Sequence, residues 1–293
     1  MLPVGVKYFN PVVKRIPYTT MFTSRGCPGQ CIFCSSPTFY GRAMRFKSSK
    51  SVLEEMRLVK ELGYKEVFFR DEIFTMSRPR VFEICEGMIN ENLNLLWIAS
   101  ARIGSVNFDS MKIMKKAGCH MLRFGVESGA QELLDNIKKG TKVPEIRETF
   151  KWAHQLGMDT HAHMMIGLPG ETKETLENTI NFVKEIDPTI VTFGILTPYP
   201  GTPIFDSLRE LNPDIGDGTE SDLSHLHTKS FLNENFTELS PEELSKYIRK
   251  VYKSFYLRPG YIFKWFGRIK SPDEFRRVLR AGTQVMSFIG GED

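Results

Sequence analysis

Short apolar runs alternate with longer amphipathic segments along most of the chain. The apolar runs lie near Thr19–Ser24, Glu66–Arg70, Leu95–Ser100, Met121–Val126, Thr160–Ile166 and Ile190–Leu196. The segments between them have helical spacing, as in residues 51–63, where Val52, Met56 and Val59 share one face. Strands that alternate with helices of this length are typical of βα units and predict a mostly parallel sheet.

Within the predicted strands, polar and apolar residues alternate with a period of two. Leu122 and Phe124 lie on one face and Arg123 on the other, and His161 and His163 share a face in a later strand. An open flat parallel sheet is covered by helices on both faces and is apolar on both. A polar inner face instead favours a barrel or partial barrel that is wide enough to hold a ligand.

Composition narrows the classes of protein that fit this pattern. The 293 residues are 25% charged and 41% hydrophobic, and the net charge of +4 does not by itself indicate a nucleic-acid or membrane partner. No apolar run reaches the roughly eighteen residues of a membrane span, and the first residues lack a signal-peptide pattern. We therefore expect a cytoplasmic protein without a membrane span.

Three of the five cysteines are crowded into the stretch SRGCPGQCIFCSSP, directly after the first predicted strand. The spacing of Cys27, Cys31 and Cys34 predicts a ligand set rather than disulfides. Three thiolates can each bind one iron of a cubane and leave the fourth iron open. Two alternatives are a zinc site completed by a distant histidine and an electron-transfer cluster completed by Cys85 or Cys119.

The same stretch resembles the C-x3-C-x-aromatic-C signature of the radical S-adenosylmethionine (radical SAM) superfamily, with Phe33 in the aromatic position. The later stretches FGVESGAQELLDNIKKG, MMIGLPGET and TPYPGTPIFD resemble further motifs of that superfamily, in the expected order. The resemblance covers roughly Thr19 to Asp206. It implies an α/β fold, a partial (β/α)6 TIM-like barrel of radical SAM type with a C-terminal helical extension.

The resemblance also implies the cofactors and the reaction class. Cys27, Cys31 and Cys34 would bind a 4Fe-4S cluster, and Phe33 would contact the adenine of S-adenosylmethionine (SAM). Reductive cleavage of SAM would then give a 5′-deoxyadenosyl radical that abstracts hydrogen from an organic substrate.

Further residues receive roles by the same resemblance. The Gly-Gly-Glu motif that often binds the methionine ammonium is absent, and Asp71 or Glu72 in FFRDEIF is expected to take its place. Glu127 and Ser128 would meet the ribose hydroxyls or the methionine group, and Gly167 would let the backbone approach the adenine.

Two arginines are candidates for the SAM carboxylate. The resemblance leaves the choice between Arg102 and Arg123 open. A structural alternative for Arg123 is an ion pair with Glu127, one strand turn away.

The motifs are similar to the branch of the superfamily whose members usually carry an N-terminal cobalamin-binding domain. Its members methylate, cyclise or rearrange organic substrates. Only some seventeen residues precede the first strand here. Either the cobalamin domain is left out of this chain, or it is a separate subunit, or this member works without cobalamin. The implied partners are a small-molecule substrate and an electron donor such as flavodoxin or ferredoxin.

The chain is expected to divide into an N-terminal extension (1–17), the barrel core (18–210) and a mainly helical extension that covers the barrel (211–293), entered through a linker at 211–225. Residues 258–280 contain seven Lys and Arg against two acidic residues. They form either a nucleic-acid surface or helices packed on the barrel, and we favour packed helices. Two alternative functions are a non-catalytic iron–sulfur carrier or assembly protein and a nucleic-acid-modifying radical SAM enzyme.

Overall fold

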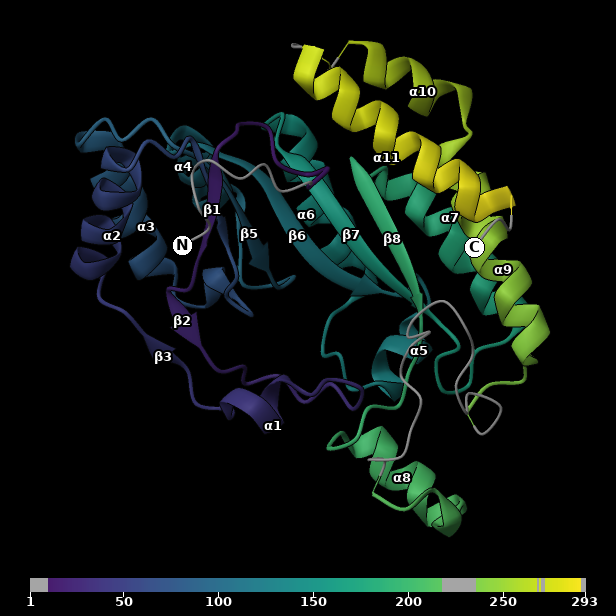
Figure 1. The fold of residues 1–293 in the computed structure, drawn as a ribbon. Coiled ribbons are helices and arrows are strands. Elements are labelled where there is room, and N and C mark those ends of the chain that lie inside the picture. Colours follow the sequence, from purple (N-terminus) through teal and green to yellow (C-terminus); the bar gives the residue numbers. More distant parts are fainter. Residues whose placement is uncertain (1–9, 218–235, 268, 270–271, 291–293) are drawn as a thin grey trace.

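Six parallel strands form one curved sheet whose order follows the chain (Figure 1). The computed structural model describes residues 10–217, 236–267, 269 and 272–290. The strands are β1 (Tyr18–Met21), β4 (Glu66–Phe69), β5 (Leu96–Ala101), β6 (Cys119–Glu127), β7 (Asp159–Ile166) and β8 (Ile190–Ile195). β1 and β8 are the two edges of this sheet, so the predicted α/β partial barrel is confirmed.

Helices follow the strands and cover the convex face of the sheet (Figure 1). Those between the strands are α2 (Ser49–Glu61), α3 (Arg78–Asn90), α4 (Phe108–Lys116), α5 (Gln131–Asn136), α6 (Val143–Gln155) and α7 (Lys173–Ile186). The others are α1 (Ser36–Tyr40), α8 (Pro203–Leu211), α9 (Pro241–Tyr256), α10 (Pro259–Phe266) and α11 (Pro272–Gly290), with 3-10 turns at Phe74–Met76 and Pro213–Ile215. No helix in these described ranges is long and apolar enough to cross a membrane.

The first predicted strand is shorter than its apolar run. β1 ends at Met21, and Ser24–Arg25 forms a separate strand, β2, antiparallel to β3 (Arg45–Phe46). The Thr23 amide donates a hydrogen bond to the Asp71 carboxylate (2.7 Å) instead of to a neighbouring strand. The chain therefore leaves the sheet two residues before the cysteine segment begins.

The predicted alternation of faces is confirmed in β6. Phe124 is buried against Phe150 of α6, with ring centroids 5.6 Å apart, whereas Met121 points to the concave side. There Met121 packs with Val13, Phe68 and Ile98 in a small apolar cluster, separate from the main core, that we call the barrel floor. The interior is thus apolar at the amino ends of the strands and polar farther along them.

The C-terminal helices lie along the β8 edge of the sheet (Figure 1). α9 packs on β8 and α7, and α11 packs on α9. The hydroxyl of Tyr256 accepts a hydrogen bond from the Val191 amide (3.1 Å) and donates one to its carbonyl (2.6 Å). Tyr252 makes the same pair of bonds to Phe193 (3.1 and 3.3 Å). These hydroxyls occupy backbone groups that an edge strand leaves exposed.

Several basic groups of residues 258–280 are used inside the molecule. Arg258 and Lys264 both pair with Asp187, at 3.0 and 2.6 Å, and Arg277 is buried. These contacts support the interpretation as packed helices. The three-part division of the chain stays a prediction, and the expected linker 211–225 lies partly outside the described residues.

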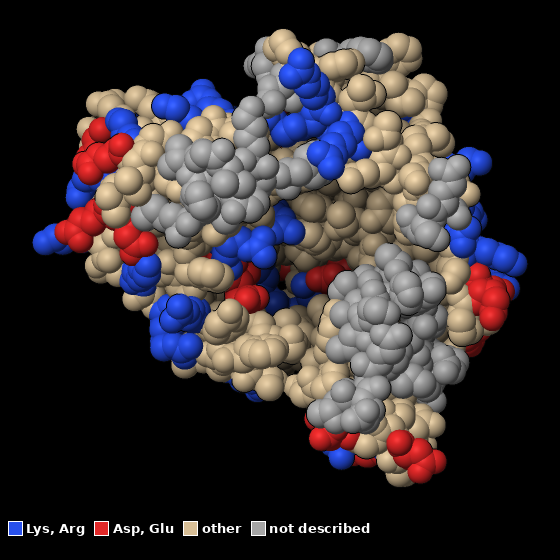
Figure 2. Space-filling model, in the orientation of Figure 1, with Lys and Arg blue, Asp and Glu red and all other residues tan. Residues whose placement is uncertain are grey.

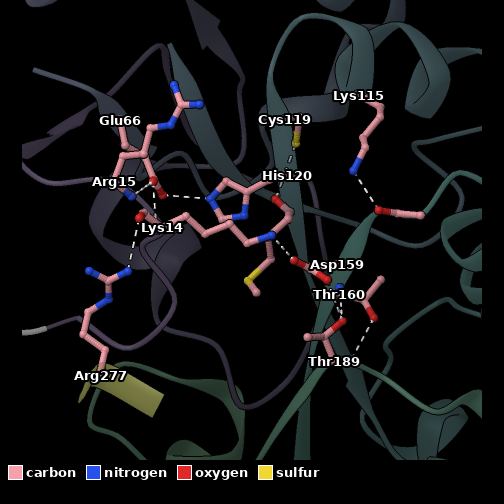
Figure 3. Close-up of polar contacts among 12 residues, drawn as sticks. Lys14, Arg15, Glu66, Lys115, Cys119, His120, Asp159, Thr160, Thr189 and Arg277 are labelled. Atoms are coloured by element: carbon pink, nitrogen blue, oxygen red, sulfur yellow. Dashed lines mark hydrogen bonds and ion pairs between the residues drawn. The ribbon is translucent and has the colours of Figure 1, made fainter. Parts of the chain in front are cut away.

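The segment before β1 closes the amino end of the barrel (Figure 3). Glu66, which is fully buried, accepts hydrogen bonds from the amides of Lys14 (2.9 Å) and Arg15 (2.7 Å) and contacts His120 Nε2 at 2.8 Å. Arg277 of α11 donates to the Lys14 carbonyl at 3.1 Å. One carboxylate therefore fixes this segment beneath the barrel floor.

Glu66→Gln is expected to lower the free energy of unfolding by about 2–4 kcal/mol, because two backbone donors and a histidine lose a buried charged acceptor. Urea denaturation of the reduced protein measures it. Glu91→Gln is the matched control, since Glu91 pairs with Arg57 on the exposed surface, where ion pairs contribute little. Equal effects of the two substitutions would contradict the role given to Glu66.

Candidate functional site

The three clustered cysteines lie in one loop that follows β2. The Cys27 amide donates to the Gly41 carbonyl (3.2 Å), and the Ile32 amide donates to the Ile137 carbonyl (3.1 Å). The Ile32 carbonyl accepts from the Ile204 amide at 3.0 Å. Segments that follow β1, β6 and β8 therefore meet at this loop, which places it at the carboxyl ends of the strands.

The thiols of this loop differ from the other two in exposure. Cys27, Cys31 and Cys34 are half-buried and form no disulfide, whereas Cys85 and Cys119 are fully buried. Burial raises the pKa of the Cys34 thiol, and the charges of Cys31, Cys27 and Glu72 raise it further. Cys119 starts β6 and so lies at the opposite end of the strands from the loop. The alternative in which it completes the ligand set is therefore wrong.

The arrangement of donors favours a cluster over a single metal ion. Within the described residues, no three Cys, His, Asp or Glu side chains are arranged to hold one ion. A cubane does not require such convergence, because each thiolate binds a different iron. The half-buried thiols of one loop therefore fit an iron–sulfur cluster.

Arg102 lies beside the thiols. Its Nη1 is 4.0 Å from Cys31 Sγ, and its Nη2 donates to the Lys139 carbonyl. A Cβ on Gly29 would lie 3.2 Å from both Arg102 Nη1 and Cys27 Sγ, so a side chain there would crowd the arginine and the thiol. Of the two predicted arginines, Arg102 is the one next to the cysteine loop.

Glu127 forms an ion pair that the sequence did not reveal. Lys139 Nζ lies 2.7 Å from Glu127 Oε1, both side chains are about nine-tenths buried, and Nζ also lies 5.9 Å from the Phe33 ring centroid. The alternative in which Arg123 pairs with Glu127 is therefore wrong, because Arg123 Nη2 contacts His163 Nε2 at 2.8 Å. In the sequence, Lys139 stands in a KKG run that gives no sign of its burial.

The adjacent acids Asp71 and Glu72 have different environments. Asp71 is buried and accepts three hydrogen bonds, from the Thr23 amide and hydroxyl and from the Ser24 hydroxyl, at 2.5–2.7 Å. Glu72 is exposed, and its charge acts on Cys34. Glu72 is therefore the exposed acid of the two, and it lies within electrostatic reach of the cysteine loop.

Ser128 and Gly167 lie close to the end of their strands. The Ser128 hydroxyl is fully buried, 3.0 Å from Thr179 Oγ1 of α7, so it points into the helix layer. Gly167 has a φ of 77°, and its amide donates to the Glu171 carboxylate. Burial raises the pKa of Glu171 to about 7, against the lowering effect of the Gly167 and Leu168 amides. Glu171 is a second residue that the sequence analysis missed.

Arg123 lies four positions before Glu127 on β6 and so deeper in the barrel. Its Cζ is 5.1 Å from the centroid of Phe68 in the barrel floor. Figure 2 shows a hollow on this side of the molecule, between the β1 and β8 flanks, where Lys, Arg, Asp and Glu side chains gather. The hollow gives the concave face of the sheet contact with solvent.

Known proteins are similar to this chain in sequence. The chain is 35% identical over 254 residues to an uncharacterized methyltransferase of Pyrococcus horikoshii. The aligned region covers 85% of this chain and 53% of that protein. The chain thus spans about half the length of this relative.

Two solved structures share the fold. One is the radical SAM methyltransferase TsrM of Kitasatospora setae, with cobalamin and a [4Fe-4S] cluster bound. The superposition covers 66% of this chain and 39% of the TsrM chain, with a TM-score of 0.62 and 19% sequence identity. The other is the cobalamin-dependent S-adenosylmethionine radical enzyme OxsB, with aqua-cobalamin and SAM bound. The superposition covers 92% of this chain and 46% of the OxsB chain, with a TM-score of 0.62 and 16% sequence identity.

The family model of the radical SAM superfamily matches residues 21–183, which is more than half of the chain and includes the cysteine loop. The predicted resemblance is confirmed by this match. The chain belongs to the radical SAM superfamily.

Proposed function

We propose that this chain is the catalytic core of a radical SAM enzyme, in which Cys27, Cys31 and Cys34 bind a 4Fe-4S cluster and the barrel holds SAM beside it. The observation that carries the proposal is the loop of three half-buried thiols at the carboxyl ends of the strands, with Arg102 4.0 Å from Cys31. Active sites of parallel barrels lie at this end. Three thiolates leave one iron of a cubane for an exchangeable ligand.

When bound, the cluster and SAM supply the radical chemistry, in which one-electron reduction cleaves SAM to methionine and a 5′-deoxyadenosyl radical that abstracts hydrogen from the substrate. The protein positions these groups. Arg102 offsets the negative charge of the thiolates and of the SAM carboxylate. Phe33 offers its ring to the adenine, and Gly167 lets the backbone approach the same base.

We assign the methionine ammonium to Glu72 rather than to Asp71. The support is that the Asp71 carboxylate already accepts three hydrogen bonds from Thr23 and Ser24. Glu72, in contrast, is exposed and lies within electrostatic reach of Cys34. A carboxylate is the natural partner of an ammonium group. We assign the ribose hydroxyls to the Glu127–Lys139 ion pair. Ser128 holds the backbone directly after Glu127 in place through its hydrogen bond with Thr179.

For the outcome of the reaction, we propose methyl transfer that uses cobalamin. The support is that the relative from P. horikoshii is named a methyltransferase and that both solved structures contain cobalamin. Cyclisation or rearrangement of the substrate would use the same cofactors. The remaining partners are a small-molecule substrate and a flavodoxin or ferredoxin as electron donor. A cytoplasmic location suits the thiols, which must stay reduced.

Cys31→Ala is expected to abolish cluster binding and SAM cleavage. After anaerobic reconstitution, the wild type should hold about four irons and, once reduced, form 5′-deoxyadenosine and methionine. Cys31→Ala should lose both properties, because its thiolate binds an iron. Iron analysis and chromatography of the products measure them.

Cys85→Ala is the matched control for the cluster, because Cys85 lies buried in α3 and should leave both properties unchanged. A wild type that binds the cluster and forms neither product when fully reduced would contradict the catalytic proposal. The iron–sulfur carrier function would then be favoured.

Glu72→Gln and Asp71→Asn are expected to separate SAM binding from folding. Glu72→Gln should weaken SAM binding about 10-fold or more, the loss of one charge-assisted hydrogen bond, with the melting temperature unchanged. Asp71→Asn should lower stability by about 2–4 kcal/mol, because three buried donors lose a charged acceptor. Equilibrium dialysis with labelled SAM and thermal melting measure the two effects. The reverse pattern would assign the ammonium to Asp71.

A further inference from the structure

Above the barrel floor, the inner faces of several strands carry basic and hydroxyl groups. We call Arg70, Arg123, His161, His163 and Thr192 the lumen layer. Arg123 and His161 are register partners in β6 and β7, and His163 and Thr192 are register partners in β7 and β8. Arg70, directly after β4, and Arg123 both lie against the ring of Phe68, with Cζ 4.8 and 5.1 Å from its centroid.

Hydrogen bonds fix the direction of the donors in this layer. Arg123 Nη2 is always a donor, so His163 Nε2 accepts from it at 2.8 Å. A neutral His163 then carries its proton on Nδ1 and donates it to Thr192 Oγ1 at 2.9 Å. When the Thr192 hydroxyl donates in turn to His161 Nε2, which lies 3.2 Å away, the His161 proton is on Nδ1.

Both histidines are neutral at physiological pH. Burial, together with the charges of Arg123 and Lys139, lowers the pKa of His163 to about 3. Burial also lowers the pKa of His161 well below its usual value, together with the charges of His163 and Arg123. The positive charge of the layer therefore resides on its arginines.

Arg123 forms no ion pair with any residue that the structure describes. Burial and the neighbouring Arg70 lower its pKa to about 10, so it remains protonated at neutral pH. Among the described residues, its side-chain hydrogen bond goes to a neutral ring, His163. Arg123 is half-buried, and a charge withdrawn from water without an opposite charge beside it is unfavourable. The protein thus maintains an unfavourable state in this layer.

Two buried donors of the layer have no partner among the described groups. They are Arg123 Nε and His161 Nδ1. Because both carry a proton, what the layer lacks is a hydrogen-bond acceptor, and the charge of Arg123 favours an anionic one. Buried polar groups are nearly always satisfied, so such donors call for an explanation.

The position of the layer suits a ligand that enters from the hollow. Val13, Phe68, Ile98 and Met121 close the barrel beneath it. The hollow in Figure 2 opens on the concave face of the sheet, where these side chains lie. A ligand held here would lie between the barrel floor and the cysteine loop.

We propose that the lumen layer is a binding site for an anionic group of the substrate, a carboxylate or a phosphate, held by Arg123 with Arg70 and His161. The inference rests on the proposed function, because it makes the ligand the substrate of that site. The SAM carboxylate is a different anion, because SAM at the cluster would lie beside Arg102 and Cys31. Arg102 follows β5 two strand positions beyond Ser100, the register partner of Arg123, which is about 6.6 Å farther along the barrel.

Titration of the reconstituted, SAM-loaded protein with pyrophosphate and with malonate tests the site. At matched ionic strength, at least one probe should bind the wild type and raise its melting temperature. Arg123→Gln should weaken that binding at least 10-fold. Arg57→Gln, which removes the same charge from the surface pair with Glu91, should bind within twofold of the wild type. The preferred probe identifies the phosphate or carboxylate class.

The melting temperature and the SAM affinity of Arg123→Gln distinguish anion binding by Arg123 from a structural role and from binding of the SAM carboxylate. Without a probe, Arg123→Gln should melt no lower than the wild type, because it removes an uncompensated buried charge, and it should bind SAM within twofold of the wild type. A lower melting temperature would make Arg123 a structural residue and overturn the inference. A 10-fold loss of SAM affinity would assign Arg123 to the SAM carboxylate and overturn it equally.

Product formation from SAM distinguishes the failure of this inference from that of the proposed function. If the wild type cleaves SAM and binds neither probe, the anion site is wrong and the proposed function stands. If it binds a probe through Arg123 and forms no 5′-deoxyadenosine when reduced, the proposed function fails and the layer is an anion site for another purpose.

Discussion

A buried carboxylate at the carboxyl end of β4 determines where the first strand ends and where the cysteine loop begins. Asp71 takes the Thr23 amide out of the sheet and binds the hydroxyls of Thr23 and Ser24 as well. Arg80 of α3 completes the junction by donating to the carbonyls of Thr23 (3.0 Å) and Lys47 (2.9 Å). These bonds connect the end of β1, the start of the cysteine loop, the segment before α2 and helix α3 at one junction. Without it, the loop would lose the anchor at its start and keep only its backbone hydrogen bonds to Gly41, Ile137 and Ile204.

Much of the fold could be predicted from the sequence because strand and helix periods are local properties. The alternation of Leu122, Arg123 and Phe124 shows which face is buried as soon as the segment is read as a strand. The end of β1 could not be predicted, because Asp71, which captures Thr23, lies 48 positions away. A hydrogen bond between distant residues leaves no periodic signal.

The site shows the same limit. The cysteine spacing identified the loop of three thiols, since these residues are neighbours in sequence. Lys139 looked like one more surface charge in a KKG run, and its burial beside Glu127 depends on how the segment after α5 folds back onto the cysteine loop. The partner of Arg123 was also unpredictable, because the sequence does not show which residues of the adjacent strand lie beside it. In the sheet Arg123 is the register partner of His161 and contacts His163, two positions farther along β7.

The edge of β8 illustrates how a helix can take the place of a strand. Tyr252 and Tyr256 are four residues apart on α9, about 6 Å along the helix, and they serve Val191 and Phe193, two residues or about 6.6 Å apart along the strand. The helix spacing and the strand spacing agree for one pair of tyrosines, but the difference grows with each further pair. A straight helix can therefore form such hydrogen bonds with only a few strand residues. The next carbonyl, that of Thr189, is bound by Tyr261 of the following helix. The break between α9 and α10 thus restores a registry that one continuous helix would lose.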